Sequence, residues 1–428
     1  IALFQGITSY NKIVERSDYL ANVLNRSSQI LLSDNPGPVL LSLPFNVQKE
    51  ELDAELLDEV VTKRQARPLK AECGSTGLLL DYLLQAQAPV IIAGYGCIRG
   101  GAQEVLQQLS NMLHIPVASS LKAKGVVDET SALSLGSLGV SSSGRAYRHI
   151  VKQADLLLIL GAAFNERTSY VWDKELTKNK TIIQVDINPD QLHKVFQADV
   201  AIQGDIREIL QDLLNRITTE HPDKFSLPSV QITPEESSSD YAVFQSGFSL
   251  VKKFFLGLEQ YFPGGAVIFD DNIIFAQNFL KVSGKNRYYP NSGISSLGHA
   301  IPAAIGAQFY QQRPSFAILG DGGFQMCCME IMTAVNYKQP LNILLFSNST
   351  MGLIRKNQHQ QYHQRFIDCD FINPDYQLLA RSFGINYQRI ENEADIEKLF
   401  AQTDLSNAIN LIEMPIGKDR FPNYSSRR

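Results

Sequence analysis

The feature that most constrains the fold is an aspartate set between glycines, in "GDGG", directly after a short apolar run. That run, "SFAILG" (315–320), predicts a buried strand, and apolar residues at every third position within 324–337 predict a helix. A second apolar run, "PLNILLFSN" (340–348), predicts another buried strand. Strands of a parallel sheet leave their carboxyl ends at one edge, where ligands bind. We therefore expect Asp321 and Asn348 to meet at that edge.

The same alternation of strands and helices extends over most of the 428 residues. A chain of this length predicts two or three domains, and the pattern predicts the α/β class, with successive parallel-sheet domains covered by helices on both faces. The net charge of −5 and the pI of about 5.9 give no indication of a nucleic-acid footprint or a membrane-surface patch. The longest apolar runs are too short for a membrane span.

Composition and periodicity divide the chain into three ordered parts joined by two connectors. The first connector is acidic, and the second is rich in proline, serine and acids without periodicity. The predicted boundaries are 1–50 for an N-terminal segment, 51–74 for a linker, 75–217 for a central domain, 218–244 for a second linker and 245–428 for a C-terminal domain.

The N-terminal segment is small. It holds one predicted helix over 15–31 and one predicted buried strand in "GPVLLSLPFNV" (37–47). One helix and one strand cannot bury their own apolar faces, so we expect residues 1–47 to be poorly ordered or to borrow contacts elsewhere. The chain begins as though within a domain, and we interpret this segment as the end of a domain whose front is absent.

The two polar turns that follow the C-terminal strands have the chemistry of a cation–phosphate site. Asp321 would hold a cation, and Gly322 and Gly323 would let backbone N–H groups at a helix start approach phosphate oxygens. Mg²⁺ typically takes one or two carboxylates together with substrate phosphates. Asn348 would add an amide oxygen. The alternative for both stretches is an ordinary turn, for which Asp-Gly and Asn are common residues.

A third stretch, "NSGISSLGHAIPAAIGAQFY" (291–310), predicts a loop followed by a helix of small residues. Leu297 is a large apolar residue in an otherwise small and polar loop, where it would either serve a bound ligand or anchor the loop to the core. We interpret His299 as a structural histidine rather than a catalyst.

These motifs, in this order, resemble thiamine-diphosphate enzymes in the style of acetolactate synthases. "GPVLLSLPFNVQ" is similar to the close of their pyrimidine-binding domain, and "ADLLLILGAAFNERTS" and "IIQVDINPDQLHK" to their Rossmann-like central domain. "GHAIPAAIGAQ", "GDGGFQM" and "NPDYQLLARSFG" are similar to their diphosphate-binding domain. The resemblance covers essentially the whole chain, so that 1–50 would be the remnant of the pyrimidine-binding domain.

The resemblance implies a set of site residues. Asp321, the side chain of Asn348 and the backbone carbonyl of Thr350 would ligate Mg²⁺, and Leu297 would be the wedge that keeps thiamine diphosphate bent, so that the cofactor generates its own reactive carbanion. The positions implied to contact the cofactor are Asn272, Ile273, Ser295, Ser296, Leu297, Gly320, Gly322, Gly323, Thr350, Met351 and Gly352.

The implied activity is that of a lyase or carboligase acting on a 2-oxo acid such as pyruvate, as in the acetolactate synthases of branched-chain amino acid biosynthesis. A simple 2-oxo acid decarboxylase, a sulfoacetaldehyde acetyltransferase-like enzyme and a non-catalytic relative are the alternatives. The sequence departs from the family at Ser347, which replaces a usual asparagine, and at "DNIIF" (271–275), which replaces a Gly-Gln-His loop. It departs again at Asn357, which replaces a tryptophan of the acceptor pocket, and leaves the acceptor open.

Four further expectations complete the interpretation. The glutamate that activates the cofactor in this family lies before the segment that residues 1–47 resemble, so we expect these 428 residues alone to bind Mg²⁺-thiamine diphosphate weakly if at all and to turn over nothing. We expect a homodimer or homotetramer, because the family places the cofactor between two chains. "GYGCIRGG" (94–101) differs from the dinucleotide fingerprint, which favours a structural central domain over one that binds FAD. Five cysteines without a CxxC pair favour reduced thiols and a cytoplasmic location.

Overall fold

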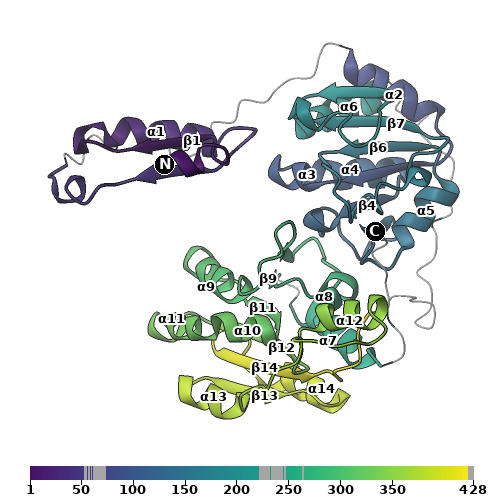
Figure 1. Ribbon diagram of the computed structural model, residues 1–428. Helices are drawn as coiled ribbons and strands as arrows, with labels where there is room; N and C mark the ends of the chain where they lie inside the picture. Colours follow the sequence, from purple (N-terminus) through teal and green to yellow (C-terminus); the bar gives the residue numbers. More distant parts are fainter. Residues whose placement is uncertain are drawn as a thin grey trace.

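The computed structural model describes residues 1–52, 74–220, 247–262 and 265–422, together with residues 55, 58, 60, 232 and 244. Figure 1 shows a small N-terminal unit, a central domain and a C-terminal domain, each built on its own parallel sheet. Both predicted linkers lie largely outside the described residues. Within the residues described, no helix has the length and apolar character needed to cross a membrane.

The N-terminal unit is a two-stranded parallel sheet with one helix. Strand β1 (Tyr10–Ile13) pairs with β2 (Val39–Ser42), and α1 (Leu20–Leu31) connects them. The sequence interpretation of one helix and one strand was therefore wrong, because it missed β1. The strand predicted over 37–47 is also shorter than expected, and its residues are half-buried rather than buried. The reason is that a two-stranded sheet has no inner strand to bury.

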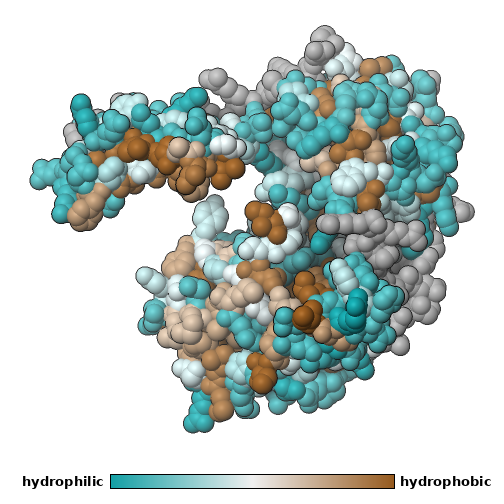
Figure 2. Space-filling view, viewed as in Figure 1, coloured by the Kyte–Doolittle hydropathy of each residue, from teal (hydrophilic) through white to brown (hydrophobic). Residues whose placement is uncertain are grey.

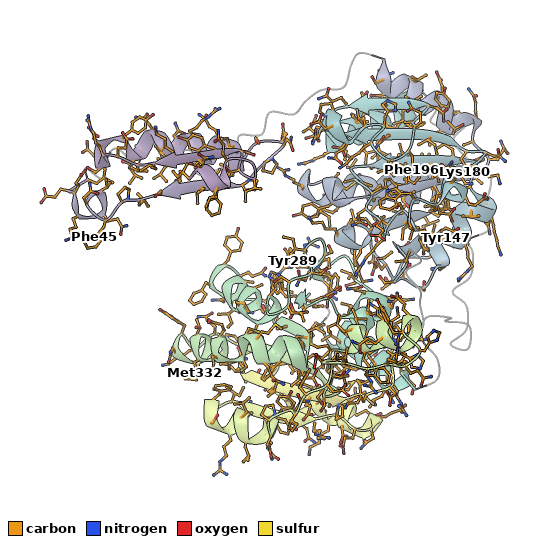
Figure 3. The ribbon with its side chains drawn as sticks, in the orientation of Figure 1. Phe45, Tyr147, Lys180, Phe196, Tyr289 and Met332 are labelled. Carbon is orange, nitrogen blue, oxygen red and sulfur yellow. The ribbon has the colours of Figure 1, made fainter. Side chains whose placement is uncertain are left out.

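The core of this unit is correspondingly small. Val14, Val23 and Val47 are its buried apolar residues, and Figure 2 shows apolar side chains gathered along its lower face. Arg99 of the central domain donates hydrogen bonds to the carbonyl oxygens of Ser33 and Asp34. Figure 3 places Phe45 at the opposite end of the unit, away from the central domain. Large hydrophobic residues that remain exposed in the unit include Leu3, Phe4, Ile7, Leu31, Leu43 and Phe45.

The central domain is a six-stranded parallel sheet in the order β5-β4-β3-β6-β7-β8. Its strands are β3 (Pro89–Ala93), β4 (Val117–Ser120), β5 (Ser134–Leu138), β6 (Leu156–Leu160), β7 (Thr181–Asp186) and β8 (Val200–Gln203). Its helices are α2 (Ser75–Gln85), α3 (Tyr95–Arg99), α4 (Gln103–Leu113), α5 (Arg145–Gln153) and α6 (Ile206–Glu220).

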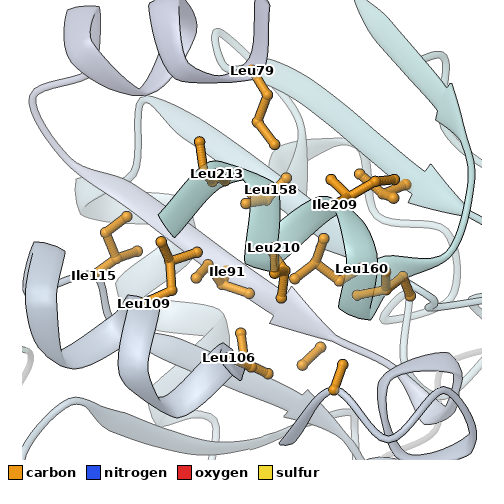
Figure 4. Packing of buried hydrophobic residues seen from close by; sticks show 14 of the residues in the cluster. Leu79, Ile91, Leu106, Leu109, Ile115, Leu158, Leu160, Ile209, Leu210 and Leu213 are labelled. Carbon is orange, nitrogen blue, oxygen red and sulfur yellow. The ribbon is translucent and has the colours of Figure 1, made fainter. Parts of the chain in front are cut away.

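Alternate residues of the inner strands enter different cores, as the two-residue period of a strand requires. Ile91 of β3 packs with residues of α2, α4 and α6 on one face, whereas its neighbours Val90 and Ile92 pack with residues of α5 on the other. Figure 4 shows the first of these cores, with Leu158 and Leu160 of β6 beside leucines of the covering helices. Both faces are covered, as the sequence predicts.

The C-terminal domain repeats this plan in the order β10-β9-β11-β12-β14-β13, again with every pair parallel. Its strands are β9 (Val267–Asp270), β10 (Arg287–Pro290), β11 (Ser315–Gly320), β12 (Leu341–Ser347), β13 (Asn386–Arg389) and β14 (Ile409–Pro415). Its helices are α7 (Ser249–Tyr261), α8 (Ile274–Phe279), α9 (Ala300–Tyr310), α10 (Asp321–Cys327), α11 (Ile331–Asn336), α12 (Gly352–Gln361), α13 (Tyr376–Phe383) and α14 (Glu393–Gln402).

The single helix predicted over 324–337 is wrong. A 3-10 turn at Cys328–Glu330 separates α10 from α11. Met326 and Met329, which belong to the apolar series that predicts the helix, are 63% and 67% exposed, whereas Phe324 and Ile331 enter the core. The 3-10 turn changes the direction of the chain between α10 and α11. A single helical spacing over 324–337 therefore does not identify the buried face of this segment.

A buried ion pair of the central domain lies where that domain meets the C-terminal domain. Lys124 Nζ lies 2.6 Å from Glu129 Oε2, and the two side chains are 4% and 5% exposed. The same Glu129 oxygen accepts the backbone N–H of Val282, at 2.9 Å, and the Glu129 N–H donates to the Val282 carbonyl, at 3.0 Å. Because Val282 belongs to the C-terminal domain, this clamp fixes one domain on the other.

Replacing Glu129 by alanine should lower the free energy of unfolding by about 3–5 kcal/mol, because it leaves the Lys124 ammonium buried without its partner. Chemical denaturation followed by circular dichroism measures this loss. The matched control is Glu175→Ala, which removes the exposed pair of Glu175 with Lys178 and should leave the denaturation midpoint unchanged. Equal midpoints for the two variants would contradict the clamp.

Candidate cofactor and metal site

The candidate site lies where the strand order of the C-terminal sheet reverses direction. From β9 the chain passes to β10 on one side and then returns to β11 on the other, and ligands of open α/β sheets bind at such switch points, beyond the carboxyl ends of the strands. Gly320 pairs with Phe346 in the register of β11 and β12, so the two strands end level. Asp321 and Asn348 therefore meet at one edge, as the sequence predicts.

The carboxylate of Asp321 joins three segments of the chain. It is 1% exposed, and its Oδ2 accepts the N–H groups of Asn348 and Ser349, at 2.8 and 2.5 Å, and the side-chain amide of Asn373, at 2.8 Å. Its Oδ1 accepts the N–H of Gly322, at 3.0 Å. This buried carboxylate thus holds the loop after β12 and the segment before α13 against the start of α10.

The loop after β12 is fixed by its own hydrogen bonds. Asn348 Oδ1 accepts the N–H of Thr350, at 3.2 Å, and Thr350 Oγ1 donates to the Cys369 carbonyl, at 2.9 Å. Thr350 also forms an antiparallel bridge with Asp370, and it is 2% exposed. The structure thus brings together the three residues predicted to ligate a metal, on a loop whose backbone is held from both sides.

Two of the predicted site glycines have no room for a side chain. A Cβ on Gly322 would lie 2.5 Å from Met351 Sδ, and a Cβ on Gly323 would lie 2.5 Å from Asp271 Oδ2. A Cβ on Gly352 would lie 3.1 Å from Asn348 Nδ2. The first turn of α10 is therefore packed closely against the side chains of Met351 and Asp271, and glycine is the residue that allows such a close approach to the backbone at a helix start.

The predicted cofactor loop lies beside these elements. Leu297 is half-buried and belongs to no apolar cluster formed by the described residues, which argues against the alternative that it anchors the loop to a core. Ser295 and Asn272 both have positive φ, at 57° and 63°, a backbone conformation that is uncommon for residues other than glycine. Ser296 and Ile273 follow them in the same two loops.

The donor set matches a hard cation rather than a transition metal. Within the described residues, no three side chains of His, Cys, Asp or Glu gather as a metal centre. One carboxylate, one amide and one backbone carbonyl are the kind of oxygen ligands that Mg²⁺ accepts alongside phosphate oxygens. The assignment of Asp321, Asn348 and Thr350 to a metal stays a prediction.

Sequence reasoning missed a buried acid next to the site. Asp270, the last residue of β9, is fully buried, and its carboxylate accepts the Tyr288 hydroxyl at 2.6 Å, the Ile273 N–H at 2.5 Å and the Gln277 amide at 3.2 Å. Burial raises the pKa of Asp270 to about 7. An acid that closes an apolar strand, in "AVIFDD", is the sequence signal that could have identified it.

The central domain has a cavity of about 800 Å³ at its own switch point, beyond the carboxyl ends of β3 and β6. A Cβ on Gly94 would lie 2.1 Å from the Gly161 carbonyl oxygen, and a Cβ on Gly161 would lie 2.6 Å from the Gly96 Cα. The cavity extends to the 292–295 loop of the C-terminal domain. The expectation of a structural domain without FAD stays a prediction. Residues lining the cavity include Tyr95, Arg99, Lys122, Phe164, Arg167 and Asp186.

Two family models match parts of this chain. A family model described as "Thiamine pyrophosphate enzyme, central domain" matches residues 78–213, and one described as "Thiamine pyrophosphate enzyme, C-terminal TPP binding domain" matches residues 272–413. Together the two models match well over half of the chain.

Curated relatives match over nearly the whole chain. The "Probable acetolactate synthase large subunit" of Methanocaldococcus jannaschii is 28% identical, over 97% of this chain and 73% of its own length. The "Acetolactate synthase large subunit" of Porphyra purpurea is 28% identical, over 91% and 68%. The protein of the same name from Lactococcus lactis subsp. lactis is 26% identical, over 92% and 68%.

The buried acid makes stability depend on pH. The pKa of Asp270 is raised in the folded chain to about 7 from an ordinary value of 3.8, so the folded state binds more protons between these values, and its stability falls as the pH rises through that window. Burial likewise raises the pKa of Glu259 to about 7. The melting temperature should decline less steeply between pH 4 and pH 7 in Asp270→Asn than in the parent. In the double variant Asp270→Asn with Glu259→Gln, the decline should be smaller still. A parental slope in the double variant would contradict this origin.

Proposed function

This chain belongs to the thiamine pyrophosphate enzymes, and we propose that it binds thiamine diphosphate with Mg²⁺ and makes or breaks a C–C bond of a 2-oxo acid, as an acetolactate synthase-like carboligase. The observation that carries the proposal is the buried Asp321 carboxylate, which ties the loop of Asn348 and Thr350 to the helix start of Gly322 and Gly323. The names of the curated relatives support the same reaction class.

The proposed metal ligands retain lone pairs for a cation. Asp321 Oδ1 accepts one hydrogen bond, from Gly322, and Asn348 Oδ1 accepts one, from Thr350, whereas an sp² oxygen has two lone pairs. Both oxygens could therefore bind Mg²⁺ without losing the contacts that hold them. The carbonyl of Thr350 would be the third protein ligand, and phosphate oxygens and water would complete an octahedral set.

The proposed diphosphate donors lie at the first turn of α10. The Gly322 N–H already donates to Asp321, so the Gly323 N–H is the better candidate for a phosphate oxygen. The other positions proposed to line the cofactor are those of the two loops and of the α12 start. They are Asn272, Ile273, Ser295, Ser296, Gly320, Met351 and Gly352.

Thiamine diphosphate supplies the carbon nucleophile that a 2-oxo acid needs to lose CO₂, which protein side chains cannot provide. In our proposal the residues of this chain hold thiamine diphosphate in place. The Asp321 loop holds the diphosphate end through the metal, and Leu297 packs against the cofactor from the opposite loop and keeps its rings in a reactive arrangement. A 2-oxo acid decarboxylase and an acetyltransferase of the same superfamily use the same parts, and the acceptor distinguishes them.

Titration calorimetry with thiamine diphosphate tests the site. The binding of the cofactor by the parent chain, which we expect to be weak, should require Mg²⁺ and be lost on chelation, and Asp321→Ala should abolish it, because the variant loses the proposed carboxylate ligand and the loop contacts together. Asp375→Asn is the control, because Asp375 is a nearby exposed acid that caps α13 and Asn also accepts the cap hydrogen bond.

Binding by Asp321→Ala at the parental affinity would show that the metal assignment is wrong. The reaction class is read in parallel from CO₂ release with pyruvate, with and without an added acceptor. Release that requires both thiamine diphosphate and Mg²⁺ supports the reaction class, and it would also show that the expectation of an inactive chain is wrong.

We further propose that the chain forms a homodimer or a larger homo-oligomer. One side of the C-terminal domain, over α9 to α11, carries large exposed hydrophobic side chains (Figure 2), and apolar patches of this kind on a soluble domain indicate an interface. Phe309 and Tyr337 stack edge to face within it, with ring centroids 5.5 Å apart. The exposed residues are Phe309, Tyr310, Met326, Met329 and Tyr337.

Light scattering at micromolar concentration should therefore give at least twice the 47.7 kDa mass of one chain. The double substitution Met326→Lys and Met329→Lys should shift the protein toward the monomer, because it places charges in the proposed interface. The matched control is Leu378→Lys on α13, another exposed hydrophobic position outside this surface. A monomeric parent would contradict the proposal.

A further inference from the structure

Asp271, the residue after β9, makes contacts that no motif in the sequence predicts. Its side chain is buried. Its Oδ2 accepts the Gly298 N–H at 2.7 Å, and its Oδ1 accepts the His299 N–H at 3.1 Å and the Asn291 side-chain amide at 3.2 Å. All three donors belong to the loop 291–299, which connects β10 to α9 and carries Leu297. Asp271 therefore holds this loop at both of its ends.

The loop needs such a restraint. Gly293, Ser295 and Gly298 all have positive φ, at 110°, 57° and 85°. Conformations of this kind, above all at a residue with a Cβ, persist where surrounding contacts hold them. The Asn291 N–H adds one further tie to the same strand end, because it donates to the Asp270 carbonyl at 2.9 Å. The strand end of β9 thus restrains the loop that places Leu297.

The same carboxylate also touches the other half of the site. A Cβ built on Gly323 would lie 2.5 Å from Asp271 Oδ2, so this oxygen lies against the first turn of α10. A charged oxygen there is favourable, because the N-termini of both α9 and α10 point positive partial charge toward it. Asp271 consequently spans the distance between the loop of Leu297 and the helix start of Gly323.

We propose that Asp271 is a positioning residue that fixes the loop 291–299 against α10 and so sets where Leu297 stands relative to the diphosphate-binding turn. This inference rests on the proposed function for its consequence, since Leu297 matters there as the side chain that packs against the cofactor. Asp271 itself need not contact the substrate. It acts through the loop, and the metal and diphosphate contacts of Asp321 and Gly323 do not pass through it.

Replacing Asp271 should therefore affect the turnover number and the affinity for thiamine diphosphate differently. In Asp271→Ala, the Asp321 loop and the α10 turn remain, so the dissociation constant of thiamine diphosphate should change less than the turnover number: removal of a negative charge next to α10 favours binding, and the looser loop of Leu297 opposes it. In a parent that releases CO₂ from pyruvate, the turnover number should fall by roughly ten- to a hundredfold, because a displacement of about 1 Å of a positioning group can cost about a hundredfold; in a parent that turns over nothing, the exchange of 291–299 decides alone. General loss of structure would weaken both quantities together.

The experiment compares the parent, Asp271→Ala, Asp271→Asn and Asp404→Ala. Asp404 is the matched control, because it also accepts two backbone N–H groups, from Ser406 and Asn407, in a turn of the same domain. Hydrogen–deuterium exchange of peptides from 291–299, in the protein without cofactor, should be faster in Asp271→Ala than in the parent and unchanged in Asp404→Ala. Asp271→Asn keeps one acceptor oxygen and should restore part of the protection and of the turnover number.

Two results would overturn the inference. One is parental exchange of 291–299 in Asp271→Ala, and the other is a parental turnover number in that variant despite faster exchange. Failure of the proposed function gives a different pattern, because the parent itself would then bind no thiamine diphosphate. In that case the exchange measurement still decides whether Asp271 holds the loop.

Discussion

Four N–H groups converge on one buried carboxylate, that of Asp321, and the rest of the candidate site depends on them. Without those donors a buried carboxylate would be strongly unfavourable, and without the carboxylate the loop after β12 and the segment of Asn373 would lose their common partner. The parallel sheet makes this arrangement available, because it ends β11 and β12 at the same level. The chemistry of the site is therefore a consequence of strand register.

The parts of the fold that the sequence predicts are the ones whose residues are buried on both faces. The inner strands β11 and β12 lie where the runs 315–320 and 340–348 predict them, although Asn342 interrupts the second run. The meeting of Asp321 and Asn348 follows from the same logic, since both residues directly follow predicted inner strands. Their roles toward a metal come from the family resemblance, which geometry alone does not establish.

The strands that the sequence does not reveal are the outermost ones of each sheet, β5 and β8 in the central domain and β10 and β13 in the C-terminal domain. β1 shares this position in the smallest sheet. An edge strand is covered less, so it can carry polar residues and loses the apolar signature, as "YNKI" in β1 shows. The sequence does not predict the contacts of Asp271 for another reason. Its partners include backbone N–H groups of a distant loop, and no spacing in the sequence indicates such a contact.

The two residues that join the domains, Glu129 and Val282, contribute different kinds of atoms to their contact, and this difference affects how the sequences of related proteins can diverge. Glu129 contributes both a side chain and its own N–H, whereas Val282 takes part through main-chain atoms. These hydrogen bonds do not depend on which side chain stands at position 282, apart from proline, which lacks the N–H, although the Val282 side chain itself is buried and lies against Gly125. Substitutions at Val282 would therefore call for no compensating change at Glu129. Two domains can in this way be joined by a contact that leaves no covariation between positions, however many related sequences are compared.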